Sequence, residues 1–266
     1  MILVILSLIF MIVSFELIMG YFDGNTSRLN RAFFAIVSCI QDYCKRHIKI
    51  LSFISSLLIL FLVVFLLFFL RPLPSLHLEF YETNYPINYL NMSDEIFFFQ
   101  SLGNCAPYSV MGVINILRGE KVNPEALARE TGWRMKGNLT FPQGLINLLR
   151  RYYVNISEYS LRSYTENEKI IWLKNKVDNG HPVILLVKVE AMQHYLTVIG
   201  YDEKGFMIYD SAQKRHDEYP GRTIVDKEDY AGNRYYTNSE LMEIWNKGGF
   251  AVFFRNWAVV CYISPT

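Results

Sequence analysis

The chain has 266 residues, of which 52% are hydrophobic, and its formal net charge is +1. This length holds one or two domains, and the near-neutral charge argues against the basic surface with which proteins bind nucleic acid. The cysteines are Cys39, Cys44, Cys105 and Cys261, and they include no C-x-x-C pair. A disulfide framework and the usual structural zinc spacings are therefore excluded, and Cys39, Cys44 and His47 lack a fourth ligand for a metal.

Two apolar segments dominate the first 70 residues. Residues 50–70 carry no charge. A helix of this length can cross the roughly 30 Å hydrocarbon core of a bilayer. Residues 1–20 are similar, and they lack the basic start and small-residue cleavage site of a signal peptide. The sequence thus predicts two transmembrane helices.

The loop at residues 21–49 carries five Lys or Arg against two Asp, whereas the first twenty residues after Leu70 carry one Arg. The positive-inside rule places this loop in the cytoplasm, and hence the following domain on the outer face of the membrane. Pro72, Pro74 and Pro86 then mark residues 71–91 as a linker. Residues 92–266 have the composition of one globular domain with a sizeable core.

A helix is predicted to begin near Cys105, because Val110, Val113, Ile114 and Leu117 recur at helical spacing. Pro107 suits the first turn of such a helix. Two further helices are expected at residues 124–131, after Asn123-Pro124, and at residues 143–153, with Thr140 as the cap.

The second half of the domain is predicted to contain the sheet. Thr165 caps a helix over residues 166–180, and strands follow at 182–189 and 194–201. Residues 202–205 (DEKG) form a hairpin turn into a strand that ends at Asp210, and a helix at 238–249 precedes strands at 251–254 and 257–263. Helices first and an antiparallel sheet second indicate an α+β fold.

Cys105 has the surroundings of a nucleophile. A thiol at a helix start meets unpaired N–H groups and the positive end of the helix dipole, which favour the thiolate. The alternative is a small buried hydrophobic residue. A nucleophilic thiol needs a base and a group that orients this base. His194 and Asp210 are expected at the same end of the hairpin and can take these roles, and Gln100 can hold the oxyanion with the backbone N–H of Cys105.

These residues resemble a known family. Gln100, then Asn-Cys-Ala-Pro at 104–107, His-Tyr-Leu-Thr-Val-Ile-Gly-Tyr-Asp at 194–202 and Tyr-Asp-Ser-Ala at 209–212 are similar to the C39 group of papain-like cysteine peptidases, the bacteriocin-processing and C39-like domains. The resemblance covers about residues 93–263. It implies a papain-like α+β domain with Cys105 as nucleophile, His194 as base, Asp210 as orienting acid and Gln100 as oxyanion residue, without a metal or organic cofactor.

The chain also departs from the bacteriocin-processing members of this family. Those are usually fused to an ATP-binding exporter, and no G-x-x-x-x-G-K-[ST] motif occurs here. Cleavage of leaders at a double-glycine site is therefore not carried over to this chain.

Other residues have structural explanations. His181, His77 and His216 lie in loops or the linker and are poor candidates for the base, and Asp202 is expected to cap its turn. Several residues are expected to pack in the core, namely Cys261, Trp172 and Trp245. The segment after Asp210 is rich in tyrosine and contains Tyr219, Tyr230, Tyr235 and Tyr236. It is expected to form either a wall of the cleft or a surface loop.

The sequence as a whole predicts a two-pass membrane protein with a cysteine peptidase domain. Its expected partners are a peptide or protein substrate, the lipid bilayer and a membrane protein. Two alternatives use the same residues: a catalytically idle C39-like module that binds a peptide at the membrane, and an enzyme that transfers the acyl group to an amine.

Overall fold

The computed structural model describes residues 38, 47, 49–50, 52–65, 87–135, 137–212, 221–224, 232–250 and 253–264. The chain divides into two compact units, Met1–Arg71 and Pro72–Thr266.

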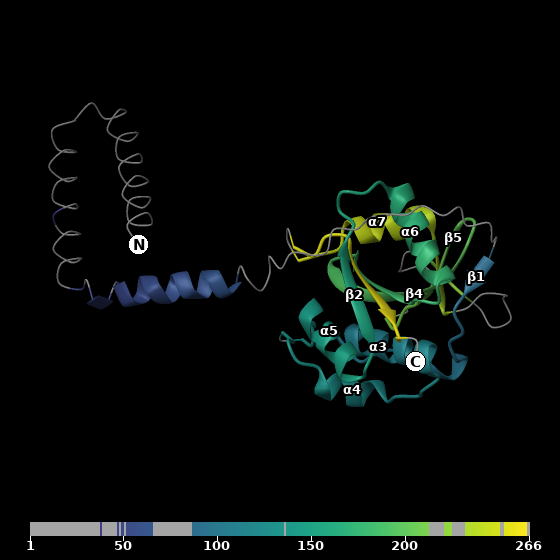
Figure 1. The fold of residues 1–266 in the computed structure, drawn as a ribbon, viewed down its shortest axis with the longest axis horizontal. Coiled ribbons are helices and arrows are strands. Elements are labelled where there is room, and N and C mark those ends of the chain that lie inside the picture. Colours follow the sequence, from purple (N-terminus) through teal and green to yellow (C-terminus); the bar gives the residue numbers. More distant parts are fainter. Residues whose placement is uncertain are drawn as a thin grey trace, which may run out of the picture. The chain divides into compact units, whose positions relative to one another are not determined.

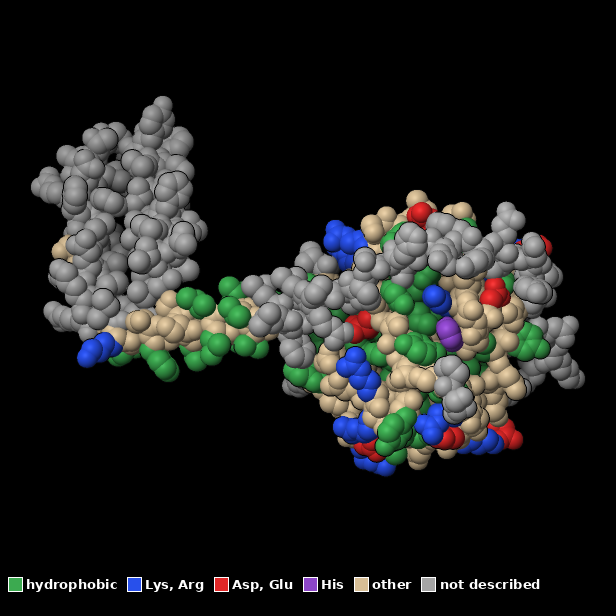
Figure 2. Space-filling view, viewed as in Figure 1, with side chains coloured by type: hydrophobic (Ala, Val, Ile, Leu, Met, Phe, Trp, Pro, Cys, Tyr) green, Lys and Arg blue, Asp and Glu red, His purple; other side chains and the backbone are tan. Residues whose placement is uncertain are grey.

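The first unit contains a helix over residues 52–65, part of the predicted span at 50–70. Its apolar side chains, such as Phe53, Leu58 and Phe61, are exposed (Figure 2). Within the described part of the chain, no helix combines the length and apolar character that crossing a membrane requires. The predicted span at residues 1–20 lies outside the described residues.

The second unit is built on a sheet in which the described residues form eight strands. All recorded pairings are antiparallel, and the order is β2-β8-β3-β4-β5-β7-β6, with β1 pairing to β4. The strands are β1 (Ile87–Tyr89), β2 (Asn155–Ser160), β3 (Val183–Val189), β4 (Met192–Asp202), β5 (Gly205–Tyr209), β6 (Arg222–Thr223), β7 (Arg234–Thr237) and β8 (Trp257–Tyr262).

Helices cover both faces of this sheet (Figure 1). The lower group in the figure holds α3 (Cys105–Arg118), α4 (Pro124–Glu130) and α5 (Pro142–Arg151), and the upper group holds α6 (Glu166–Asp178) and α7 (Asn238–Asn246). A short 3₁₀ helix, η1 (Asp94–Ile96), precedes α3. The predicted α+β class with an antiparallel sheet is confirmed, although α6 and α7 form a second helical layer.

Each face of the sheet has its own core, because successive strand side chains point to opposite faces. In β3, Ile184 and Leu186 belong to the core that includes α3 and α5, whereas Val183, Leu185 and Val187 pack against α6 and α7. Each fully buried aliphatic side chain contributes roughly 1.5–3 kcal/mol to stability. The apolar run of β3 is therefore explained by burial on both faces.

Helix starts were predicted well, with one error. Thr165 accepts a hydrogen bond from the Glu168 N–H and Glu168 reaches back to the Thr165 N–H, which is a complete capping box for α6. Thr140 does not cap α5: its N-cap is Phe141, and the Thr140 hydroxyl donates to the Asn138 carbonyl instead. Pro142 at the first helical position needs no partner for its nitrogen.

Four strands were not predicted. β1 lies in the segment assigned to the linker, β2 was left unassigned, and β6 and β7 fall in the tyrosine-rich segment after Asp210. The predicted strand at 251–254 is not found in its described part, where Phe253 forms only an isolated bridge with Phe250.

Candidate active site

Cys105 is the first residue of α3 and is 3% exposed. Asn104 is the N-cap, but its side chain does not cap the helix. Its Nδ2 donates to Ser101 Oγ at 2.5 Å, and its Oδ1 accepts from the Arg134 guanidinium. The N–H groups of the first turn are thus left without a side-chain cap next to the thiol.

The turn that carries Cys105 is held by a neighbouring loop. Gly103 has φ +73°, and a Cβ on it would lie 2.2 Å from the Gly137 carbonyl oxygen. Asn138 Nδ2 donates to the Leu102 carbonyl at 3.0 Å. The backbone of Leu102 and Gly103 therefore packs directly on Gly137 and Asn138, which fixes where the helix begins.

His194 and Asp210 form a buried pair at the open end of the β4–β5 hairpin. His194 Nε2 lies 2.8 Å from Asp210 Oδ1, and the two residues are 5% and 0% exposed. The Cys105 side chain lies close enough to the same imidazole to raise the pKa of His194, after the larger effect of Asp210. Since Asp210 occupies Nε2, Nδ1 is the nitrogen left for the thiol.

The pair is arranged to be charged. Burial by itself lowers the pKa of His194, but the charge of Asp210, its hydrogen bond and the adjacent Cys105 together raise this pKa well above its ordinary value. Burial favours a neutral Asp210, but the charge and hydrogen bond of His194, the Ala212 N–H and the charge of Arg234 together lower its pKa. The site therefore holds an imidazolium against a carboxylate.

Two residues that were not predicted support Asp210 from β7 and the turn before it. Arg234 is fully buried, with its Nε 3.4 Å from Asp210 Oδ2. The Asn233 side chain accepts from the Asp210 N–H and donates to the Asp210 carbonyl, each at 2.8 Å. The local sequence, Asn-Arg-Tyr-Tyr, carries no signal for this contact, because the partner Asp210 comes from another strand end.

Gln100 is tied to the residue that follows Asp210. Its backbone N–H donates to the Ser211 carbonyl at 2.8 Å, and its Oε1 accepts from the Ser211 hydroxyl at 2.7 Å. Because the oxygen of the carboxamide is engaged, its NH₂ group is the end left to donate to a substrate oxygen. Ser211 was not predicted to have a role.

The remaining candidates are placed as follows. Asp202 accepts from the N–H groups of Lys204 and Gly205, as expected of a turn residue. The His181 ring packs on the ring of Tyr262, at the end of β8. Residues buried in the core are Cys261, Trp172, Trp245, Tyr235 and Tyr236. Other residues considered from the sequence lie outside the described part of the chain, namely Cys39, Cys44, His77, His216, Tyr219 and Tyr230.

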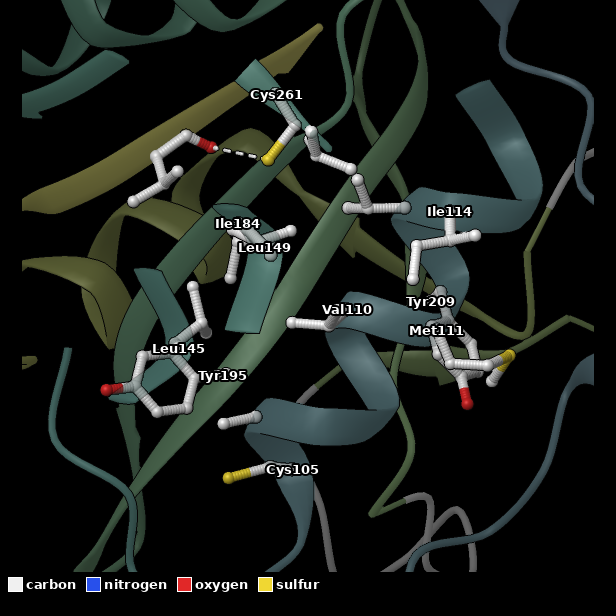
Figure 3. Packing of buried hydrophobic residues seen from close by; sticks show 14 of the residues in the cluster. Cys105, Val110, Met111, Ile114, Leu145, Leu149, Ile184, Tyr195, Tyr209 and Cys261 are labelled. Carbon is white, nitrogen blue, oxygen red and sulfur yellow. Dashed lines mark hydrogen bonds between the residues drawn. The ribbon is translucent and has the colours of Figure 1, made fainter. Parts of the chain in front are cut away.

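The two described cysteines differ in surroundings. Figure 3 shows Cys105 at the end of α3 and Cys261 within the packed strands, where its sulfur lies 3.9 Å from the Val259 carbonyl oxygen. Burial raises the pKa of Cys261 strongly. Among the described residues, no group of His, Cys, Asp and Glu could hold a metal ion.

The sequence of residues 87–241 matches the profile of the Peptidase_C39 like family, over more than half of the chain. The chain belongs to this family. The matched region runs from β1 into α7 and includes Cys105, His194, Asp210 and Gln100. Membership in the C39-like family agrees with the resemblance found in the sequence.

Two solved structures match this chain at low identity. A structure described as that of a C39-like peptidase from Bacillus anthracis is 14% identical, with 67% of this chain and 99% of that chain covered and a TM-score of 0.44. The peptidase domain of Streptococcus ComA, a bifunctional ABC transporter of a quorum-sensing pathway, is 14% identical, with coverages of 66% and 98% and a TM-score of 0.39. A search of curated proteins finds no significant match.

Proposed function

We propose that the chain is a cysteine peptidase that cleaves a peptide or protein through an acyl-enzyme on Cys105. The observation that carries this proposal is the buried pair of His194 and Asp210, with Nε2 and Oδ1 2.8 Å apart, next to Cys105 at the start of α3. A nucleophile, a base and an orienting acid in this order have the roles of a catalytic triad.

Each residue has a defined step. The Cys105 thiolate attacks the scissile carbonyl, and the C–N bond breaks as the His194 imidazolium gives its proton to the leaving amine. His194 then takes a proton from water, which attacks the thioester and releases the acid and the free thiol. Asp210 orients the imidazole, and the Gln100 amide with the Cys105 N–H stabilises the oxyanion.

Labelling with a thiol-directed peptide electrophile tests this proposal. The full-length chain should be labelled on Cys105 and should cleave peptides, whereas Cys105→Ala should lose both the label at residue 105 and the activity. Cys261→Ala is the matched control and should behave as the unmodified chain, because Cys261 is buried in the core. His194→Ala should slow alkylation of Cys105 at pH 6, where only a paired thiolate reacts quickly.

The same experiment separates the alternatives. If Cys105 is alkylated only above about pH 8, and at the same rate with and without His194, the thiol is not paired with this histidine. This result would favour the alternative of a peptide-binding module without catalytic activity. Product analysis with added amines would reveal acyl transfer, since a transferase yields the new amide rather than the free acid.

We also propose that the peptidase is anchored in the membrane and faces outward, on the strength of the uncharged residues 50–70 and the basic loop 21–49. Protease added to intact spheroplasts should then digest the domain after Arg71, while a cytoplasmic marker survives. Digestion only after the membrane is opened would place the domain in the cytoplasm.

A further inference from the structure

A pocket of about 640 Å³ lies beside the turn that leads into Cys105. It is lined by η1, Phe98, Phe99, Tyr108 and residues 121–125, and we name it the Glu125 pocket. This volume is within the range of pockets that bind ligands. Phe98 and Phe99 are 44% and 64% exposed, so aromatic surface is open to a ligand there.

Glu125 gives the pocket its charge. The other two charged lining residues, Glu95 and Lys121, form an ion pair with each other. Oε1 of Glu125 accepts hydrogen bonds from Ser101 Oγ at 2.7 Å and from Tyr108 Oη at 2.8 Å. These hydrogen bonds, with that of Ser101 the larger, lower the pKa of Glu125 and keep it anionic.

The pocket is connected to the nucleophile by a short chain of contacts. Ser101 donates to Glu125 and accepts from Asn104, which precedes Cys105 in the sequence. Tyr108 lies one turn after Cys105 on α3. These contacts link Glu125 to the residue before Cys105, so the Glu125 pocket lies beside the turn that leads to the nucleophile.

We propose that the Glu125 pocket is a specificity subsite for an arginine or lysine side chain of the substrate. An aliphatic stem packs on the exposed phenylalanines, and the cationic end meets the Glu125 carboxylate and the aromatic faces. This inference rests on the proposed peptidase function, and it adds the chemical class of substrate that the peptidase selects.

Binding to an inactive enzyme tests the subsite. Two sets of fluorescent ten-residue peptides are used, each with a single Arg or a single citrulline at successive positions of an otherwise uncharged sequence. Citrulline has the shape of Arg without its charge. For full-length Cys105→Ala, an Arg peptide should bind about tenfold more tightly than its citrulline partner at one or more positions, as expected for one charge-assisted contact at a half-exposed site.

Substitution of the carboxylate decides the assignment. In the Cys105→Ala background, Glu125→Gln should bring the Arg-to-citrulline ratio close to one, because Gln still accepts from Ser101 and Tyr108 but has no charge. Glu130→Gln, at the other end of the same helix, is the matched control and should keep the ratio. No Arg preference at any position, or a preference that survives Glu125→Gln, would overturn the proposal.

The binding assay also separates this inference from the peptidase function. An Arg preference in binding with no cleavage by the unmodified chain would support the subsite and refute the peptidase. Cleavage without any Arg preference would support the peptidase and refute the subsite.

Discussion

Asp210 is the most constrained residue of the site, because both its carboxylate oxygens and its backbone are held. Oδ1 accepts from Ala212 N–H and bonds His194, and Oδ2 lies at ion-pair distance from Arg234. Asn233 bonds the backbone of Asp210 on both sides. A fully buried carboxylate needs such compensation, since an unpaired buried charge is strongly destabilising.

Arg234 should matter for both stability and pH dependence. Arg234→Met should lower the free energy of unfolding by about 3–5 kcal/mol at pH 7, as removal of one partner of a buried ion pair does. Arg234 lowers the pKa of Asp210, so its loss should move the acid-side fall of kcat/KM to higher pH. Urea unfolding and pH–rate profiles measure the two effects.

Arg234→Lys is the conservative control. It keeps the positive charge and should retain the acid-side position of the pH profile while losing part of the stability. A profile that is identical in the Met and Lys variants would show that Arg234 acts only in packing.

The charge of Asp210 should set the alkaline limit of activity. Asp210 raises the pKa of His194, so the imidazolium persists above the ordinary histidine value of about 6.5. In Asp210→Asn the residual kcat/KM should therefore fall at lower pH than in the unmodified chain. An unchanged alkaline limit would contradict the ion pair.

The raised pKa of His194 also makes the stability of the folded chain depend on pH. A raised His194 pKa in the folded state stabilises the protein fully below about pH 6.5 and loses this contribution as pH rises through the folded value. The stability difference between the unmodified chain and Asp210→Asn should therefore shrink at alkaline pH.

At the scale of residues, the sequence was enough to predict where three candidate groups lie in the fold. Cys105 marks a helix start, and His194 and Asp210 lie at the ends of a hairpin with a recognisable turn. Arg234 and Ser211 were missed because their contacts depend on β5–β7 pairing and on the path of the chain before α3. No local pattern specifies such pairings.

At the scale of elements, the turn at 101–104 positions the nucleophile through its contacts with Arg134, Gly137 and Asn138. The Arg134 guanidinium reaches both the Asn104 side chain and the Ala128 carbonyl, so it ties the turn to the end of α4. The start of α3 is therefore fixed by tertiary contacts rather than by a side-chain cap.

Two glycines with similar backbone angles test this fixation. Gly103 and Gly119 have φ +73° and +68°, but a Cβ on Gly119 would meet nothing within 4 Å. Gly119→Ala should cost about 1 kcal/mol of stability from strain alone. Gly103→Ala should cost about 3 kcal/mol, because overlap with the Gly137 carbonyl adds to the strain, and it should reduce kcat by displacing Cys105. Equal losses in both variants, measured by urea unfolding, would argue against the contact.

Helices were easier to predict than strands for a physical reason. A helix such as α6 has its start encoded locally, in Thr165 and Glu168. β2 consists of Asn-Ile-Ser-Glu-Tyr-Ser, and its stability comes from its pairing with β8, which is more than ninety residues away in the sequence. Thr140 was misjudged as a cap because its hydroxyl competes for a nearby carbonyl, a local alternative that the sequence does not rank.

At the scale of the folded unit, the candidate site lies where one helical layer meets the sheet. The thiol comes from α3, whereas the imidazole and the carboxylate come from the β4–β5 hairpin. Packing between α3 and β4 therefore sets the distance between the nucleophile and the base. Core substitutions that loosen this packing are expected to reduce turnover before they unfold the chain.

The place of β8 between β2 and β3 affects how the protein matures on the ribosome. In the described sheet, β2 is joined to the other strands only through β8. Cys105, His194 and Asp210 are all synthesised before Trp257, but the strand that closes the sheet emerges after them. A nascent chain thus carries its whole reactive set on an unfinished scaffold, and translation must pass Tyr262 before the scaffold can be completed. The strand order therefore requires residues up to Tyr262 before β2 can join the rest of the sheet.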